Sequence, residues 1–287
     1  MKLEKLRAWI LTLLELVRVR NAAIAFFGVF VGSMLSPYGA PLLVVLTAGL
    51  SAALILAGGN AINDYFDVEI DRVNKPRRPI PSGRMNSSDT LMIALILFFS
   101  GVGMAKHINT YCLAIAAFNS VLLILYAKYS KKLLFIANLA VSYLVASVFV
   151  YGAAATLNAP VMEPAKFTMI YILAACSFFM TLSREVVKDM EDIEGDRRQY
   201  SYTLPILIGA ENARRVAIAF GAMAILSSIL PFLSNAAPFR IILYAPIIAI
   251  ADIIFIFSFT LKPEKSQKIM VVGMVLSLIA FMAGATA

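Results

Sequence analysis

Residues 41–71 read PLLVVLTAGLSAALILAGGNAINDYFDVEID, in which an apolar run passes directly into a row of acidic residues. The apolar part, residues 41–62, is long enough to cross the hydrocarbon core of a bilayer as a helix, which needs about 20 residues. Backbone groups in lipid must be hydrogen-bonded within their own segment, so a helix is expected here. The stretch therefore predicts a membrane helix with an acidic extension at its end.

Similar apolar runs recur along the whole chain of 287 residues. Hydrophobic residues make up 61% of the sequence and charged residues 15%, whereas a soluble protein has roughly 45–50% and about 25%. We predict an all-α, polytopic membrane protein with a single domain over residues 1–287 and an N-terminal helix that lies on the membrane surface. The nine predicted transmembrane helices are residues 21–37, 41–62, 89–106, 110–127, 134–156, 166–184, 213–233, 239–261 and 267–286.

Basic residues are distributed unevenly between the predicted loops. With a cytoplasmic N-terminus and nine spans, 22 of the 25 Lys and Arg residues face the cytoplasm, and only Lys106, Lys166 and Arg240 face outward. Cytoplasmic loops of membrane proteins show this excess of Lys and Arg. The net charge of +8 therefore indicates a lipid bilayer as the partner, with the N-terminus inside the cell, and not nucleic acid.

Two long cytoplasmic loops, residues 63–88 and 185–212, hold most of the acidic residues, which membrane orientation does not require. Each loop, together with the end of the helix that leads into it, carries four polar residues at i, i+4, i+7 and i+11, a spacing that places them on one face of a helix. The second set follows the first at a constant interval of 125 residues, which we interpret as an internal repeat. The two sets are Asn60, Asp64, Asp67 and Asp71, and Glu185, Asp189, Asp192 and Asp196.

A row of carboxylates one helical turn apart repels itself unless cations neutralise it. Mg²⁺ prefers oxygen ligands and usually takes one or two carboxylates together with substrate phosphates. The Lys and Arg residues beside both rows are suited to direct phosphate contacts. The pattern therefore predicts that Mg²⁺ and a diphosphate bind at the two rows.

At these residues the chain resembles the UbiA superfamily of intramembrane prenyltransferases. The resemblance rests on Asn63-Asp-x-x-Asp-x-x-x-Asp71, on Asp192-x-x-x-Asp196 and on Arg18-x-x-Asn21. Residues 74–83 are also similar to the family, and residues 126–132 resemble its Tyr-x-x-x-Lys element with one extra residue between Tyr126 and Lys131. Any lysine of residues 128–132 could therefore be the one that contacts phosphate. The resemblance implies nine helices around a central cavity and a cytoplasmic cap formed by the two Asp-rich loops.

Within that superfamily, residues 184–196 are most similar to the archaeal digeranylgeranylglyceryl phosphate synthases. This similarity implies Mg²⁺-dependent transfer of a geranylgeranyl group from its diphosphate to the glycerol hydroxyl of geranylgeranylglyceryl phosphate, which forms the second ether bond of archaeal lipids. The expected catalytic metal ligands are Asp64, Asp67, Asp71, Asp192 and Asp196. The expected substrate contacts are Asn21, Asn60, Arg72, Arg78, Tyr126, Lys131, Lys188, Asp189 and Arg197.

Other functions remain open from the sequence. Within the same family the acceptor could be an aromatic ring or a tetrapyrrole, and outside it the chain could be a transporter or a lipid scramblase. A transporter usually places its coupling groups near the middle of the membrane, whereas the charged residues here gather at one face. We expect Asp64→Ala or Asp192→Ala to abolish turnover and to leave the protein folded. The sequence does not indicate an oligomeric state.

Overall fold

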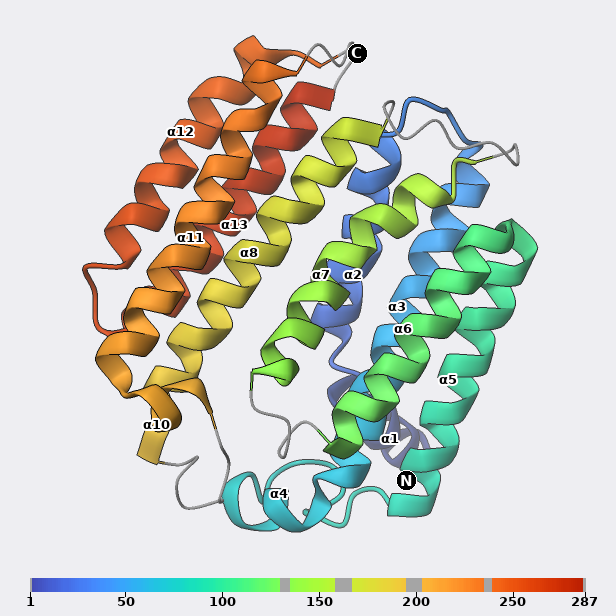
Figure 1. The fold of residues 1–287 in the computed structure, drawn as a ribbon. Helices are drawn as coiled ribbons and strands as arrows, with labels where there is room; N and C mark the ends of the chain where they lie inside the picture. Colours follow the sequence, from blue (N-terminus) through green and yellow to red (C-terminus); the bar gives the residue numbers. More distant parts are fainter. Residues whose placement is uncertain (1, 130–134, 158–166, 195–202, 235–238, 286–287) are drawn as a thin grey trace. The chain divides into compact units, whose positions relative to one another are not determined.

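The structure, a computed structural model, describes residues 2–129, 135–157, 167–194, 203–234 and 239–285, and the regular elements in these ranges are helices (Figure 1). Eight of the described helices are long and apolar enough to cross a membrane. They coincide with eight of the predicted spans, which confirms an all-α, polytopic membrane protein. The remaining predicted span, residues 21–37, falls on α2, a shorter apolar helix at Val19–Met34.

The chain forms two compact units. The first contains Met1–Phe30 and Ala40–Tyr129, and the second contains Val31–Gly39 and Ser130–Ala287. Helix α2 therefore contributes to both units, since the division falls after Phe30. The single domain expected over residues 1–287 stays a prediction.

Helix α3 (Leu42–Phe66) is the principal packing element of the first unit, where it contacts α5 (Ser87–Ile108) and α6 (Thr110–Tyr129). The close approach of α3 and α5 depends on Gly101. Its carbonyl accepts a hydrogen bond from Ser51 Oγ at 2.7 Å. A Cβ at this position would lie 2.6 Å from Ile55 Cγ1 and 2.9 Å from the Ser51 carbonyl oxygen.

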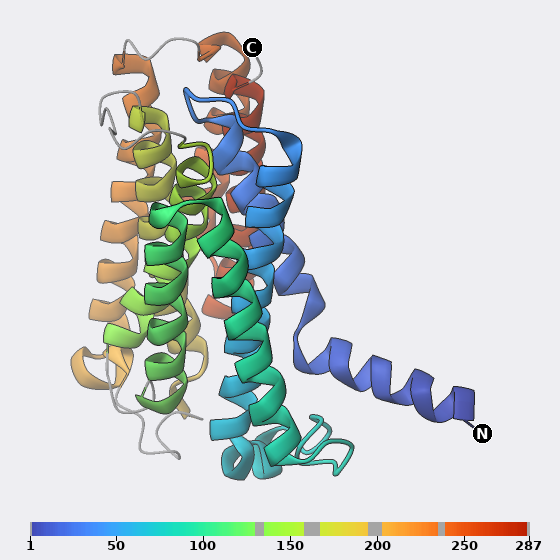
Figure 2. The same cartoon turned by 90° about the vertical axis from the view of Figure 1, so that its right-hand side faces the viewer.

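Helix α1 (Lys2–Leu16) extends away from these three helices, as Figure 2 shows. Apolar side chains such as Leu3 (81% exposed) and Trp9 (51%) lie on its surface without protein contacts that would bury them. This is the arrangement expected of a helix that lies in the membrane interface. The turn between α1 and α2 contains Arg18, which has a φ of 48° and is the one described non-glycine residue with positive φ.

The second unit is organised around α8 (Thr168–Glu191), which packs against α7 (Ile136–Ala154), α11 (Ala210–Leu233) and α13 (Pro263–Ala285). The C-terminal part of α8 is anchored by Val186 and Val187, whose side chains are buried against residues of α11 and α13. This packing fixes the part of α8 that carries the second acidic row. The other described helices of this unit are α10 (Leu204–Ile208) and α12 (Ile241–Ser258).

The internal repeat extends to the backbone. Helix α3 ends at Phe66, directly before Asp67 (φ −89°, ψ 2°), and α8 ends at Glu191, directly before Asp192 (φ −94°, ψ 7°). In both units the aspartate N–H donates to the carbonyl four residues earlier. The same helix end at the same interval supports the interpretation of a repeat.

This helix end also modifies the expected geometry of the first row. The spacing predicts one continuous helical face, but Asp64 lies on α3 and Asp71 lies on the separate short helix α4 (Val68–Asn74). The break occurs because Asp67 adopts a conformation between the main allowed backbone regions, which is common at turns and in active sites. The first row therefore presents carboxylates from two consecutive helices.

Candidate active site

Asp64 and Asp71 form a buried cluster with two arginines in the first unit. Both aspartate side chains are only 5% exposed. Arg18 Nη2 donates to Asp64 Oδ1 at 2.8 Å, and Arg78 Nη1 donates to the same oxygen at 3.0 Å. The same Arg78 nitrogen also donates to Asp71 Oδ2. A single guanidinium nitrogen thus connects carboxylates from α3 and α4.

Asn60 ties this cluster to the turn between α1 and α2. Its side-chain amide donates to the Val17 carbonyl oxygen at 3.0 Å, and its own oxygen accepts from Arg18 Nη1 at 3.4 Å. Asn60 therefore contacts the arginine that holds Asp64, which helps to direct the guanidinium toward the carboxylate. Elsewhere in the row, Asp67 Oδ2 accepts a hydrogen bond from the Asn63 amide at 3.0 Å.

The loop that carries Arg78 is fastened to α1. Arg84 forms two hydrogen bonds with Glu15, at 2.6 and 3.0 Å, and also donates to the Arg77 carbonyl and, at 2.9 Å, to Ser82 Oγ. The Glu15 contact raises the pKa of Arg84. These bonds hold residues 77–84 in place, so the position of Arg78 depends on α1 as well as on the carboxylates.

Lys75, which follows α4, adds a further positive charge near the cluster. Partial desolvation lowers its pKa, and the charge of Arg78 lowers it further, whereas Asp71 acts in the opposite direction. Arg18, Arg78 and Lys75 thus place three cationic side chains beside the two carboxylates. Such a site is suited to an anion with several negative oxygens, such as a diphosphate.

Asp64 and Asp71 also fit a divalent cation. Among the described residues, no group of three or more His, Cys, Asp and Glu side chains is placed to hold a metal ion. The two carboxylates nevertheless converge on one position, which the positively charged Arg78 Nη1 occupies. Since Mg²⁺ usually takes one or two carboxylates and completes its shell with water and phosphate oxygens, two convergent carboxylates are sufficient.

The second acidic row has a different set of partners. Glu185 is buried and accepts from Arg184 at 2.9 Å and from Lys188 at 3.3 Å. Asp189 Oδ2 accepts from the Asn138 amide at 2.8 Å, and the Asp192 side chain is exposed. The repeat therefore preserves the residue spacing and the helix end, but not the hydrogen-bond partners.

The remaining expected site residues lie apart from these contacts or beyond the described part of the chain. Arg72 pairs with exposed Glu69 at 3.0 Å and not with the aspartates of its row. Asn21 is exposed on α2, and Tyr126 is half-buried on α6. Lys131, Asp196 and Arg197 lie outside the described residues. The roles assigned to these residues stay predictions.

Asn138 is a polar partner that the sequence reasoning missed. It lies on α7, is 7% exposed, and its amide is directed to Asp189 on α8. The signal was present, because Asn138 is an amide within an otherwise largely apolar predicted span, and polar residues in a membrane helix usually have a structural or functional partner. Nothing in the spacing, however, connects it with Asp189.

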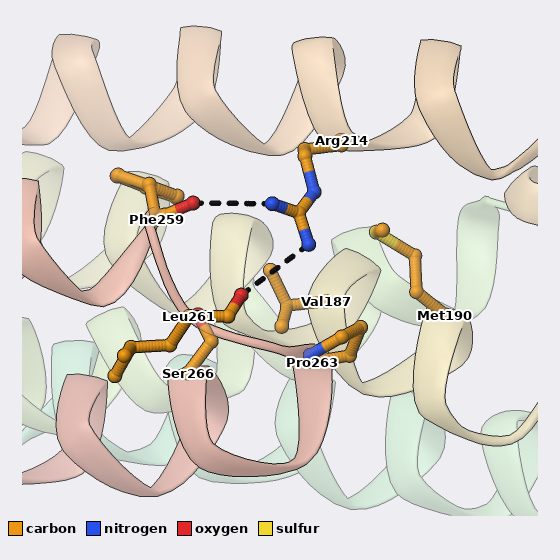
Figure 3. Close-up of a pocket in the computed structure, with 7 residues that line it drawn as sticks. All are labelled: Val187, Met190, Arg214, Phe259, Leu261, Pro263 and Ser266. Carbon is orange, nitrogen blue, oxygen red and sulfur yellow. Dashed lines mark hydrogen bonds between the residues drawn. The ribbon is translucent and has the colours of Figure 1, made fainter.

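A small pocket behind the end of α8 is structural in character. Seven residues line its volume of about 10 Å³ (Figure 3), which is about enough for one water molecule. Arg214 donates to the carbonyls of Phe259 and Leu261, each at 3.3 Å, and so satisfies groups at the end of α12. The guanidinium is thereby engaged in joining α11 to the α12–α13 turn.

The helices and the charged clusters together define a class: a multi-pass membrane protein with buried carboxylate–guanidinium chemistry at the ends of its spans. The sequence model of the UbiA prenyltransferase family matches residues 25–279. The chain belongs to this family and is a prenyltransferase.

Similar proteins of known name cover nearly the whole chain. A digeranylgeranylglyceryl phosphate synthase from Methanopyrus kandleri is 45% identical over 276 residues, which are 94% of this chain and 97% of the relative. The enzyme of the same name from Methanococcoides burtonii is 38% identical and covers 96% of this chain and 99% of its own.

Solved structures agree with this relationship. A structure concerned with digeranylgeranylglyceryl phosphate synthase in membranes has a TM-score of 0.82 at 35% identity and covers 98% of this chain and 99% of its own. A UbiA homologue from Archaeoglobus fulgidus bound to DMAPP and Mg²⁺ has a TM-score of 0.73 at 16% identity and covers 96% and 99%. At that identity the second likeness concerns the fold alone.

Proposed function

We propose that the protein transfers a geranylgeranyl group from geranylgeranyl diphosphate to the glycerol hydroxyl of geranylgeranylglyceryl phosphate, with Mg²⁺ as cofactor. The product carries the second ether bond of archaeal membrane lipids. The near full-length similarity to enzymes of that name supports the choice of donor and acceptor. The observation that carries the site is the convergence of Asp64 and Asp71 on one cationic nitrogen.

In this proposal Asp64 and Asp71 hold Mg²⁺ with Asp67 as a further ligand, and Asp192 and Asp196 are metal ligands of the second acidic row. The metal, when bound, stabilises the charge that develops on the leaving diphosphate. Arg18 and Arg78 donate to phosphate oxygens, since guanidinium groups suit phosphate geometry. Asn138 orients Asp189 through its 2.8 Å hydrogen bond.

The reaction breaks the bond between C1 of the geranylgeranyl group and the diphosphate oxygen, which keeps the electron pair. The glycerol hydroxyl oxygen then forms the new bond to C1, and its proton passes to a carboxylate or to the released diphosphate. Apolar side chains protect the allylic cation from water during the transfer. The excess of Lys and Arg in the predicted inner loops supports a cytoplasmic orientation of the N-terminus and of both acidic rows.

Product analysis tests this function. The purified protein in lipid nanodiscs is incubated with Mg²⁺, labelled geranylgeranyl diphosphate and geranylgeranylglyceryl phosphate, and the lipids are analysed by mass spectrometry. We expect the diether phosphate, and none after chelation of the metal. A preference for an aromatic acceptor offered in parallel, or metal-independent product formation, would overturn the proposal.

A further inference from the structure

Arg78 is bound to the same two carboxylates that the proposed function assigns to Mg²⁺. Its Nη1 lies 3.0 Å from Asp64 Oδ1 and also contacts Asp71 Oδ2, and Arg18 Nη2 donates to the same Asp64 oxygen at 2.8 Å. A guanidinium and a metal ion cannot both neutralise these oxygens at the same position. The arginines and Mg²⁺ are therefore competitors for the aspartates.

We propose that Arg78, together with Arg18, exchanges partners when substrate binds: it leaves the carboxylates to Mg²⁺ and moves to the diphosphate of the donor. This inference rests on the proposed function, in which the first acidic row binds Mg²⁺. It adds that the arginines change partners from the carboxylates to the diphosphate. It makes Arg78 a residue that couples metal binding to donor binding.

The exchange follows from the burial of the two carboxylates. Both side chains are 5% exposed, and a buried carboxylate that loses its cationic partner is strongly destabilised. Diphosphate alone would draw Arg78 away and leave the aspartates uncompensated. Mg²⁺ alone would displace Arg78, which has a side chain only 20% exposed, and leave the guanidinium uncompensated. Only the two ligands together satisfy every charge.

The loop geometry keeps Arg78 close enough to act in both pairings. Arg78 follows Asp71 by seven residues, and the neighbouring Arg84 fastens the same loop to Glu15 through two hydrogen bonds. Since the backbone of the loop is held, release from the aspartates requires only a change in the side chain. The guanidinium then lies beside the metal-bound carboxylates, where the donor phosphates are expected.

This arrangement predicts opposite effects of Arg78→Gln on two binding reactions. Loss of the competing cation should tighten binding of the metal alone. Loss of the phosphate contact should weaken binding of the metal–donor complex. We expect each change in affinity to be about tenfold, which corresponds to the lower end of the free energy of a hydrogen bond to a charged group. Because coupling between ligands is reciprocal, the increase in donor affinity caused by the metal should become smaller.

The test measures binding in wild type and in Arg78→Gln, in nanodiscs without acceptor. Mn²⁺, which accepts the same oxygen ligands, is titrated while free ion is followed by electron paramagnetic resonance. A slowly ionising thiodiphosphate analogue of the donor is titrated at saturating Mg²⁺. Arg215→Gln is the matched control, since it removes one Arg charge whose side chain is 71% exposed and pairs with Glu211 at 3.6 Å. We expect no change in either affinity there.

Opposite shifts in Arg78→Gln support the exchange. Shifts in the same direction, or unchanged affinities, would overturn it. Should Arg78→Gln fail to fold, Arg78→Lys is measured instead and should show smaller shifts of the same opposite signs, because an ammonium group keeps the charge but not the planar fork. Because the binding measurement needs no turnover, its outcome is independent of the product assay. The exchange can be refuted even if the diether product forms, and it can be supported even if another acceptor is the substrate.

Discussion

Replacement of Asp64 by alanine should remove both activity and a measurable part of the stability. Asp64 joins Arg18 and Arg78, with side chains that are 33% and 20% exposed. Removal of one partner from a buried ion pair costs about 3–5 kcal/mol. The lower end applies here because both arginines retain some solvent and Arg78 keeps Asp71. A loss of about 3 kcal/mol corresponds to a decrease of about 6 °C in melting temperature for a chain of this length.

Asp192→Ala provides the comparison. Its side chain is exposed at the end of α8, and substitutions at exposed positions usually change stability by less than about 0.5 kcal/mol. Both variants should abolish transfer of labelled geranylgeranyl groups, but only Asp64→Ala should melt earlier by scanning fluorimetry. The structure thus adds a difference in stability to the expectation that both variants stay folded. Equal melting temperatures, or near wild-type turnover in either variant, would refute the reasoning.

Three further predictions concern packing, orientation and the α1 contact. Gly101→Ala should destabilise the protein by about 1–3 kcal/mol through overpacking, while Gly103→Ala, which meets no atom within 4 Å, should leave the melting temperature unchanged or slightly higher. Asn138→Ala should lower kcat about tenfold or more, as expected for a lost hydrogen bond to a carboxylate; a normal kcat would exclude an orienting role. Glu15→Gln should increase deuterium exchange in the loop around Arg84 without measurable unfolding, and unaltered exchange would show that the α1 contact does not hold that loop.

The membrane spans and the repeat could be predicted from the sequence because they depend on local patterns. Runs of apolar residues specify membrane helices through the cost of an unsatisfied backbone in lipid. The interval of 125 residues between the acidic rows is printed directly in the sequence, and the equivalent helix ends at Asp67 and Asp192 agree with it. The spans and the repeat can therefore be predicted without knowing which helices contact each other.

The partners of the acidic side chains could not be predicted in the same way. Arg18 and Asp64 are 46 residues apart, and Asn138 and Asp189 are 51 residues apart. Such contacts depend on helix packing and side-chain direction, which periodicity does not specify. The break between α3 and α4 could not be predicted for a related reason. The spacing from Asp64 to Asp71 is that of one helical face, and it gives no sign that the helix is interrupted at Asp67.

The positive φ of Arg18 has a consequence for how this protein can change over time. A left-handed backbone costs an ordinary side chain roughly 1–2 kcal/mol, a penalty that glycine would avoid. Yet glycine cannot reach Asp64 as Arg18 does at 2.8 Å. Glycine at this turn would therefore relieve the backbone strain but leave buried Asp64 without one of its two cationic partners, a loss that outweighs the relief. The strained backbone at Arg18 is thus retained because both the stability of the turn and the charged cluster depend on this side chain.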